Sequence, residues 1–314
     1  CQAFMRELFR HIGAETDVNT ALSETLFNDR IDIYSNSWGP LDDGDRLEGP
    51  GPLLRAALAE GVEQGRGGLG SIYVWAAGNG GQSGDNSNYD GYANSRFVLA
   101  VTGTDHLGRQ ATYAEPGANI ALNVPSSGNG RSVTTTDLSG FAGYNAFGNS
   151  DYEDTDYTST FGGTSAACPT VAGVAALMLQ ANPELTWREV RTILMRTAVV
   201  NDPEDADWTR NGAGLPVNHK YGFGRVDALG AVEAASAWIS QGKPAEASST
   251  ADPDLPIPDN DPEGVSFSVH IEDDFNVEFV ELTFSADDHP YWGDLQVELV
   301  SPQGTVSVLA ESRA

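Results

Sequence analysis

The feature that most constrains this chain is a turn of small residues, from Gly162 to Ser165, that leads directly into a long apolar segment. Pro169 is compatible with the first turn of a helix, because the first N–H groups of a helix have no intrahelical partner. The same N–H groups and the helix dipole favour negative charge beside Ser165. The segment therefore predicts a helix with a serine at its N-terminus, acting either as a nucleophile or as an ordinary cap.

A second motif lies upstream, at the end of an expected strand. Residues 71–77 form a continuous apolar run of strand length, which is typical of a buried parallel strand. The run ends in Gly78, Asn79, Gly80 and Gly81. Ligands of open α/β sheets bind at the carboxyl ends of the strands. We therefore expect Asn79 at a ligand-binding edge, and the alternative is an asparagine in a glycine-rich turn.

Two strings carry a family resemblance. G-T-S-A-x-x-P-x-V-A-G, from Gly163, and A-A-G-N-G-G, from Ala76, resemble the nucleophile segment and the oxyanion-hole loop of subtilisin-like serine proteases. The resemblance covers about residues 13–240 and implies an α/β fold with three layers around a central parallel sheet. It implies that Ser165 is the nucleophile of acyl-enzyme catalysis and that Asn79 donates to the tetrahedral intermediate.

The segment 31–40 alternates like a strand and ends in Ser37, Trp38 and Gly39, which match the edge that pairs with an extended peptide in this family. The strings around Asp42 and Asp90 resemble the kexin and furin branch, the proprotein convertases. The resemblance implies that these two carboxylates face the basic side chain before the scissile bond. Paired carboxylates repel one another unless a cation is present, so the polypeptide substrate would carry Arg or Lys there.

The same resemblance implies a calcium ion beneath that pocket, held by Asp42, Asp85 and Glu115. Carboxylate oxygens are ligands that Ca²⁺ prefers. The alternative for each of these residues is a solvated surface position, because the chain contains 45 acidic residues. Their positions within the two family strings favour the calcium site.

The chain departs from the family in its outer subsite and its catalytic base. An ungapped comparison puts Thr20 where furin-like enzymes recognise a more distant arginine, which leaves Glu48 and Tyr92 as contributors. Animal relatives carry cysteines in the loop that here spans 87–89. None of the five histidines precedes Gly-Thr or Gly-Ser, as the family's catalytic histidine does, and the triad Asp is missing upstream of Ser37.

A serine without a base is a weak nucleophile, so we expect this chain alone to be inactive. It is either part of a calcium-dependent serine endopeptidase that cleaves after basic residues, or a non-catalytic peptide-binding pseudoprotease or inert fragment. The first interpretation requires that the N-terminal third of the catalytic domain is missing. Residues 1–12 match nothing in the family and are compatible with an amphipathic helix or a misjoined start.

Helices are expected on both sides of a break at 182–186. Residues 170–180 are apolar all round, which predicts a helix buried in the centre of a domain, and 187–198 predict an amphipathic helix. Cys168 is expected to be a small core residue. Tyr221 begins another string that matches the family, followed by an Ala-rich helix.

The pattern changes after residue 240. Residues 241–260 are rich in Pro, Ala, Ser and Asp without periodicity, which predicts a linker. Segments 265–271, 277–284 and 294–300 then alternate with period two, which predicts a β-sandwich. G-D-L-x-V-x-L-x-S-P-x-G-T resembles the P domain of proprotein convertases, a jelly roll. We expect a catalytic domain at 1–240, a linker at 241–260 and a partial P domain at 261–314, with the chain cut at both ends.

The net charge of −28 excludes binding to nucleic acid through phosphate attraction. With only two cysteines, the fold does not depend on disulfides. No stretch reaches the roughly 18 apolar residues that a membrane span requires, and no signal peptide is recognised. We expect a secreted or extracytoplasmic monomer.

Overall fold

The computed structural model describes residues 16–25, 27–146, 152–273, 276–286, 289 and 291–312. The expected amphipathic helix or misjoined start at 1–12, together with His11, lies outside these residues.

A parallel sheet of four strands, in the order β1-β2-β3-β4, forms the centre of the molecule. Its strands are β1 (Ile33–Asn36), β2 (Ile72–Ala76), β3 (Val98–Thr104) and β4 (Ile120–Pro125). Both β2 and β3 are buried along their whole length, which explains why the sequence of 71–77 is continuously apolar rather than alternating. Because the strands are parallel, the segments that follow β1 and β2 leave the sheet at one edge.

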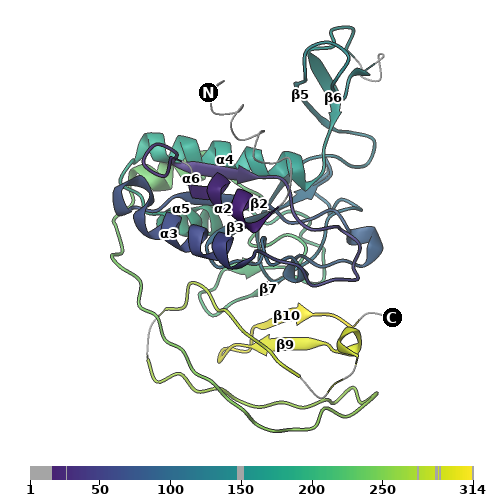
Figure 1. Cartoon of the computed structure of the whole chain (residues 1–314), viewed down its shortest axis with the longest axis vertical. Coiled ribbons are helices and arrows are strands. Elements are labelled where there is room, and N and C mark those ends of the chain that lie inside the picture. Colours follow the sequence, from purple (N-terminus) through teal and green to yellow (C-terminus); the bar gives the residue numbers. More distant parts are fainter. Residues whose placement is uncertain are drawn as a thin grey trace.

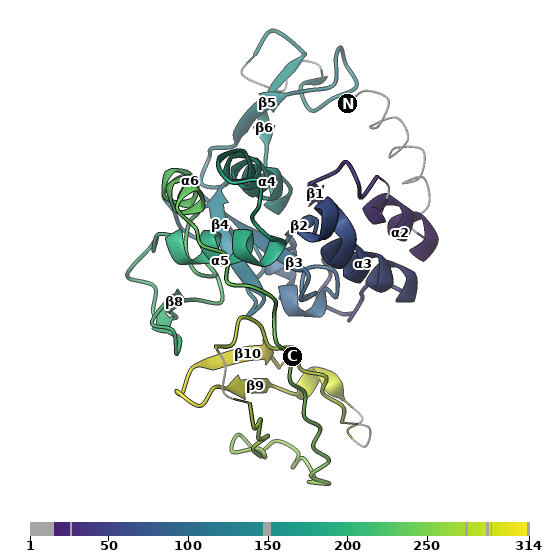
Figure 2. The same ribbon diagram turned by 90° about the vertical axis from the view of Figure 1, so that its left-hand side faces the viewer.

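Helices cover both faces of this sheet, which Figure 2 shows between two helical layers. On one side lie α2 (Asp17–Thr25) and α3 (Pro52–Gly68), and on the other α4 (Thr164–Ala181), α5 (Trp187–Thr197) and α6 (Ala228–Ser236). Leu58, Tyr73 and Trp75 belong to the core on the α3 side, whereas Val74, Val101 and Ile193 belong to the core on the α4 side. The predicted three-layer α/β fold is confirmed.

The helix α4 begins at the predicted turn but differs from the prediction in its burial. It packs on β1, β2 and β3, and its buried residues include Ala167, Val171 and Val174. The expectation that it is buried on all sides is wrong, because Leu177 is 50% exposed and Thr170 is also exposed. The helix belongs to an outer layer, where the sheet and α6 cover part of its surface and the rest faces solvent.

Among the described helices, α4 is also the one that is long and apolar enough, by length and composition, to cross a membrane. Half of its 18-residue window is buried inside the molecule. The contacts of α4 with three central strands are those of a core helix that packs on a sheet.

Short elements connect the layers. The hairpin of β5 (Val133–Thr136) and β6 (Tyr157–Phe161) projects beyond α4 in Figure 1 and leads directly into its N-terminus. Two turns of 3₁₀ helix, η1 (Gly81–Ser83) and η2 (Ser87–Tyr89), follow β2. The short strands β7 (Thr209–Arg210) and β8 (Pro216–Val217) precede α6.

The region after α6 is much less regular (Figure 1). No helix or strand forms within 241–260, the expected linker. A 3₁₀ turn, η4 (Trp292–Asp294), precedes β9 (Val297–Val300), which pairs antiparallel with β10 (Val306–Ala310). The strand predictions for 265–271 and 277–284 are wrong, since no described residue there joins a ladder. Alternation supplies only one apolar face, and a strand also needs a hydrogen-bonded neighbour.

Candidate active site

The small-residue turn and the glycine-rich loop meet at the edge where β1 and β2 end. Gly163 precedes α4 with φ 75° and ψ 177°, a conformation that is open almost only to glycine. A Cβ atom at this position would lie 3.0 Å from Oδ1 of Asn79. The backbone at Gly163 therefore brings the Asn79 side chain against the start of α4, where Ser165 lies in the first turn.

The side chain of Asn79 is anchored at its oxygen. Oδ1 accepts hydrogen bonds from the N–H of Thr164 at 2.9 Å and from the hydroxyl of Thr164 at 3.1 Å. A backbone N–H can only donate, so these bonds determine which end of the amide is the oxygen. The NH₂ group of Asn79 is consequently the donating end of this side chain. The sequence analysis did not predict a role for Thr164, although this residue directly precedes Ser165 and bonds Asn79.

The predicted substrate edge lies beside the predicted nucleophile. Ser37 Oγ donates a hydrogen bond to the carbonyl oxygen of Ser165 at 3.0 Å. The Trp38 carbonyl accepts from Trp75 Nε1 at 2.7 Å, and its own indole donates to Asn36 Oδ1 at 3.1 Å. Within the described residues, the N–H groups of Ser37 and Gly39 have no hydrogen-bond partner. Main-chain donors are thus free at this edge, as pairing with an extended chain would require.

An acidic pocket lies next to this edge. Four of its lining residues are the acids that were predicted to bind the basic side chain or the metal ion, namely Asp42, Asp85, Asp90 and Glu115. The other four are Pro40, Leu41, Arg46 and Tyr89. The four acidic residues come from three separate loops, which the sheet edge brings together. These eight residues together form the acidic pocket.

Backbone N–H groups hold each carboxylate of the acidic pocket. Asp42 accepts from the N–H of Asn79 at 3.2 Å, and Glu115 accepts from the N–H of Gly80 at 2.8 Å. Asp85 Oδ2 accepts from the N–H of Gly44 at 3.0 Å. Asp90 Oδ1 accepts from the N–H of Tyr92 at 2.8 Å. The glycine-rich loop after β2 therefore positions the acids as well as Asn79.

These hydrogen bonds do not compensate for burial. Burial raises the pKa of Glu115 to about 8 and the pKa of Asp90 to about 7, and neighbouring carboxylates contribute to both shifts. Burial also raises the pKa of Asp42, against hydrogen bonds from the backbone and side chain of Asn79. Carboxylates that are hard to ionise together attract a cation, because a positive charge removes their mutual repulsion.

A basic side chain already lies at the pocket, although the sequence analysis did not single it out. Arg46 lines the acidic pocket, and its guanidinium pairs with Asp43 at 3.0 Å and with Glu48 at 3.7 Å. Both of these partners are therefore different from the four acids that line the pocket. An arginine within a run of acidic residues is a signal that sequence reasoning could have used.

The three expected calcium ligands line one pocket, but their carboxylates are not gathered around one point. Within the described part of the chain, no group of three or more His, Cys, Asp or Glu side chains is gathered closely enough to hold a metal ion. Asp42, Asp85 and Glu115 nevertheless line one pocket and supply only oxygen donors, which is the donor chemistry that Ca²⁺ takes. The residues therefore fit the ion in donor chemistry, and binding would require these carboxylates to converge further.

The residues of the expected outer subsite lie around the same loops. The backbone of Glu48 pairs with the segment beside Asp90, through the N–H of Gly91 at 2.7 Å and the carbonyl of Tyr89 at 3.3 Å. Tyr92 stacks on Trp75, with 5.6 Å between ring centroids, and meets Trp38 edge-on. The hydroxyl of Thr20, in contrast, bonds carbonyl groups at the start of its own helix, α2.

Within the described part of the chain, no general base contacts the predicted nucleophile. Among the histidines that the structure describes, none hydrogen-bonds Ser165. His219 forms a pair with Asp207, at 3.1 Å from Nδ1, but its Nε2 accepts a hydrogen bond from the N–H of Val308 at 3.0 Å. Both ring nitrogens are occupied, so this pair supports structure rather than proton transfer at Ser165. Cys168 is a buried, free thiol in the core, as expected.

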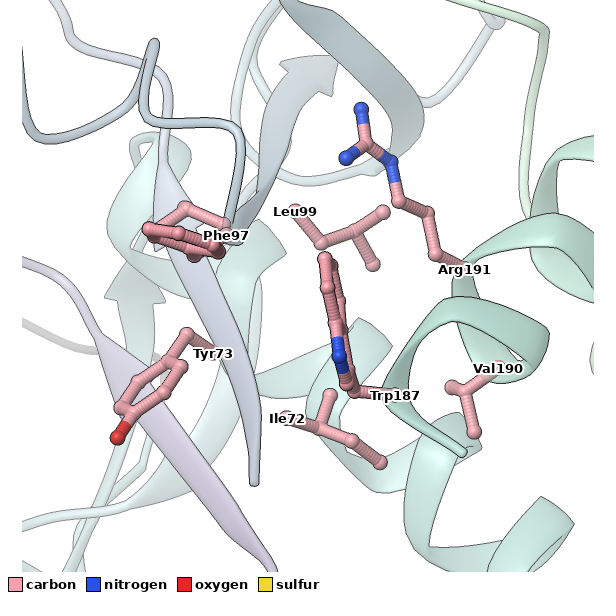
Figure 3. Close-up of a pocket in the computed structure, with 8 residues that line it drawn as sticks. Ile72, Tyr73, Phe97, Leu99, Trp187, Val190 and Arg191 are labelled. Atoms are coloured by element: carbon pink, nitrogen blue, oxygen red, sulfur yellow. The ribbon is translucent and has the colours of Figure 1, made fainter. Parts of the chain in front are cut away.

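A second hollow is apolar and lies between the sheet and α5. Figure 3 shows the Trp187 ring among Ile72, Leu99 and Val190, with Arg191 nearby. Its volume is about 10 Å³, as is that of the acidic pocket, so volume does not separate the two hollows. They differ in their lining, because the acidic pocket carries four carboxylates and lies at the sheet edge beside Asn79, and it is therefore the candidate site.

Comparisons with known proteins match both the region that builds the candidate site and the C-terminal region. The model of the subtilase family matches residues 10–224, and the model of the proprotein convertase P-domain matches residues 277–314. The chain is 39% identical over 315 residues to the PC3-like endoprotease variant B of Hydra vulgaris. It is 38% identical over 319 residues to the proprotein convertase subtilisin/kexin type 6 of Rattus norvegicus. Each alignment covers 96% of this chain, but only 42% and 31% of the relatives, so the chain spans less than half of their length.

Solved structures show the same fold. The serine protease of Aeromonas sobria matches with a TM-score of 0.76 at 25% identity, over 94% of this chain and 59% of that chain. The same protease in complex with its chaperone matches with a TM-score of 0.80 at 24% identity, over the same shares. With the family match covering most of the region that builds the candidate site, the chain belongs to the subtilase family, in its kexin and furin-like proprotein convertase branch.

Proposed function

We propose that this chain carries the nucleophile, the oxyanion donor and the substrate pocket of a calcium-dependent serine endopeptidase that cleaves polypeptides after basic residues. The observation that carries the proposal is the junction at the sheet edge. Asn79 Oδ1 is held by Thr164, and Ser37 is bonded to the Ser165 carbonyl, so three predicted functions meet around one helix start. An ordinary helix cap would need none of these contacts.

In this proposal Ser165 Oγ attacks the scissile carbonyl carbon, and its proton passes to a general base. The Asn79 amide donates to the oxyanion as negative charge develops. The leaving amine takes up a proton as the C–N bond breaks, and water then hydrolyses the ester. Because no base contacts Ser165 among the described residues, this chain alone lacks one participant.

The substrate proposal rests on charge. An arginine or lysine side chain that enters between Ser37–Gly39 and the acidic pocket would meet Asp42 and Asp90. Each charge-assisted hydrogen bond contributes roughly 1.5–3 kcal/mol. Asp42, Asp85 and Glu115 would hold Ca²⁺, which supplies the positive charge that lets buried carboxylates ionise together. Glu48 and Tyr92 would contact residues further upstream in the substrate.

The region 1–240 would form this catalytic unit, 241–260 the linker and 261–314 the start of the P domain. We propose a secreted or extracytoplasmic monomer, because the strongly acidic charge fits a secreted, calcium-loaded protein.

The alternative is a peptide-binding relative without catalysis, which the missing base favours. The expected inactivity and the substrate class are tested with a fluorogenic peptide that has arginine before the scissile bond, by measuring its turnover and its binding on the purified 314-residue chain and on Ser165→Ala. We expect no turnover from either, and binding of the peptide by both. Turnover that disappears in Ser165→Ala would contradict the expected inactivity, and preferred binding of peptides with leucine or phenylalanine at that position would contradict the substrate class.

A further inference from the structure

The loop between two of the pocket acids is held from outside the catalytic unit. Asp85 and Asp90 flank η2, which contains Asn88 and Tyr89. Asn88 Nδ2 donates to the carbonyl of Val308 at 3.3 Å. The partner residue belongs to β10, so the C-terminal hairpin reaches the loop that carries the acids.

Tyr89 makes the stronger connection. Its hydroxyl donates to the carbonyl of Glu311 at 3.1 Å and accepts from the N–H of the same residue at 2.8 Å. The phenol thus both donates to and accepts from the backbone of one residue. The Tyr89 side chain is 7% exposed, and its ring lines the acidic pocket beside Asp85 and Asp90.

The hairpin itself is fixed independently of this loop. His219 Nε2 accepts from the N–H of Val308, and Asp207 holds the other nitrogen of the ring. The strand β10 therefore has one anchor at 207–219 and a second at η2. A segment with two anchors can transmit its position to the loop, whereas a hairpin held only by Tyr89 would move with it.

We propose that Tyr89 is a positioning residue through which the C-terminal hairpin sets the geometry of the acidic pocket. This inference takes the pocket's ligands, Ca²⁺ and a basic side chain, from the proposed function. The contact between Tyr89 and Glu311 is independent of that function. The backbone of Glu311 orients the phenol, the ring forms one wall of the pocket, and Asp85 and Asp90 on either side follow the loop.

The test uses the full 314-residue chain, four single variants and the double variant of Tyr89→Phe with Glu311→Pro. Tyr89→Phe removes the hydroxyl, and Glu311→Pro removes the N–H that donates to it. Glu311→Ala keeps that N–H and is the control for the side chain. Tyr221→Phe is the matched control for a buried tyrosine, because its hydroxyl also accepts from a backbone N–H and donates to an acid, Asp202, but does not line the acidic pocket.

Two measurements are compared with the unfolding midpoint of each variant. The first is the dissociation constant of Ca²⁺ alone, by titration calorimetry. We expect Tyr89→Phe and Glu311→Pro to raise it about three- to tenfold, the range that one or two lost hydrogen bonds produce, and the double variant to add little more. The second is amide hydrogen exchange in 85–92, which we expect to accelerate in the same two variants and in neither control.

The outcomes separate this inference from the proposed function. Equal loss of stability in Tyr89→Phe and Tyr221→Phe, with calcium affinity and exchange in 85–92 unchanged, would overturn the inference and assign Tyr89 to packing alone. Faster exchange in a chain that binds no Ca²⁺ would support the contact but overturn the calcium site. Changes in both measurements that Glu311→Ala and Tyr221→Phe do not reproduce support the inference.

Discussion

The region from Asp17 to Ser236 and the region from 261 to 312 both contain regularly spaced apolar residues, but only the first buries them. In the first region, Val74 and Leu194 are completely buried between the sheet and the α4 layer. In the second, Phe267, Val277 and Leu282 are 50%, 63% and 46% exposed. The difference shows that an apolar pattern becomes a core only where a second layer covers it.

The two regions nevertheless touch at defined points. Figure 1 shows the β9–β10 hairpin below the sheet and its helices, and its contacts reach η2 and His219. A second contact joins α5 to the segment near 278, where Arg188 bonds Glu278 and Arg191 lies over the Phe279 ring at 4.6 Å. The less buried region is therefore attached through polar contacts and a few ring contacts.

The largest expected effect is the difference in unfolding free energy between alanine substitutions of one leucine in each region. Leu194→Ala should cost about 2–5 kcal/mol of unfolding free energy, because it leaves a cavity in a closed core. Leu282→Ala should change the unfolding free energy by less than about 0.5 kcal/mol, since the side chain remains in contact with solvent. Urea denaturation measures both. Similar losses of unfolding free energy in the two variants would mean that the second region also has a buried core in solution. That result would contradict the difference between the two regions.

Calcium should stabilise the first region, because all the proposed ligands lie there. At free Ca²⁺ about a hundredfold above its dissociation constant, mass action gives the native state ~2.7 kcal/mol. A thermal melt with calcium or a chelator, repeated for Asp85→Ala, checks this. An unshifted midpoint in the unmutated chain would remove the calcium site, and a shift of equal size in Asp85→Ala would place the ion at another acidic cluster.

The buried Glu24 predicts a pH dependence that belongs to the first region. It bonds Asn36 Nδ2 at 3.2 Å, and burial raises its pKa from 4.5 to about 8. Between these two values the folded state keeps a proton that the unfolded state releases. Stability should therefore fall as the pH rises from about 4.5 to 8, on the order of 1 kcal/mol per pH unit from this group.

Glu24→Gln tests this expectation, because the amide cannot ionise. Unfolding by urea at several pH values, in the presence of a chelator, should give a shallower fall in the variant than in the unmutated chain. Asp90 and Glu115 are present in both proteins and contribute equally. Parallel curves would show that Glu24 does not titrate in this range.

The smallest effect is expected at the link between the regions. Arg188 donates to both oxygens of Glu278, at 2.9 and 2.7 Å, and the arginine side chain is 16% exposed. Glu278→Ala should cost about 0.5–1 kcal/mol at low salt, and less at high salt because the pair is partly solvated. The control is Asp29→Ala, whose pair with Arg30 is 77% and 76% exposed. Equal effects would show that the link contributes nothing specific.

Several elements could be predicted from local sequence because their causes are local. The run at 71–77 becomes β2 since a strand covered on both faces needs apolar residues throughout. The helix starting near Trp187 is preceded by Thr186, which caps it together with Glu189. The predicted strands at 265–271 and 277–284 did not form ladders, because alternation carries no information about the partner strand.

The candidate site divides in the same way. The sequence by itself determined which residue types are present, through the strings around Asn79 and Ser165 and the acidic residues near Gly44 and Tyr92. Only the tertiary structure decided that Asn79 bonds Thr164, that four acids share one pocket, and that Tyr89 reaches Glu311. The physical reason is that these contacts join segments far apart in the chain. A parallel sheet brings the ends of its strands to one edge, and local patterns do not encode which loops meet there.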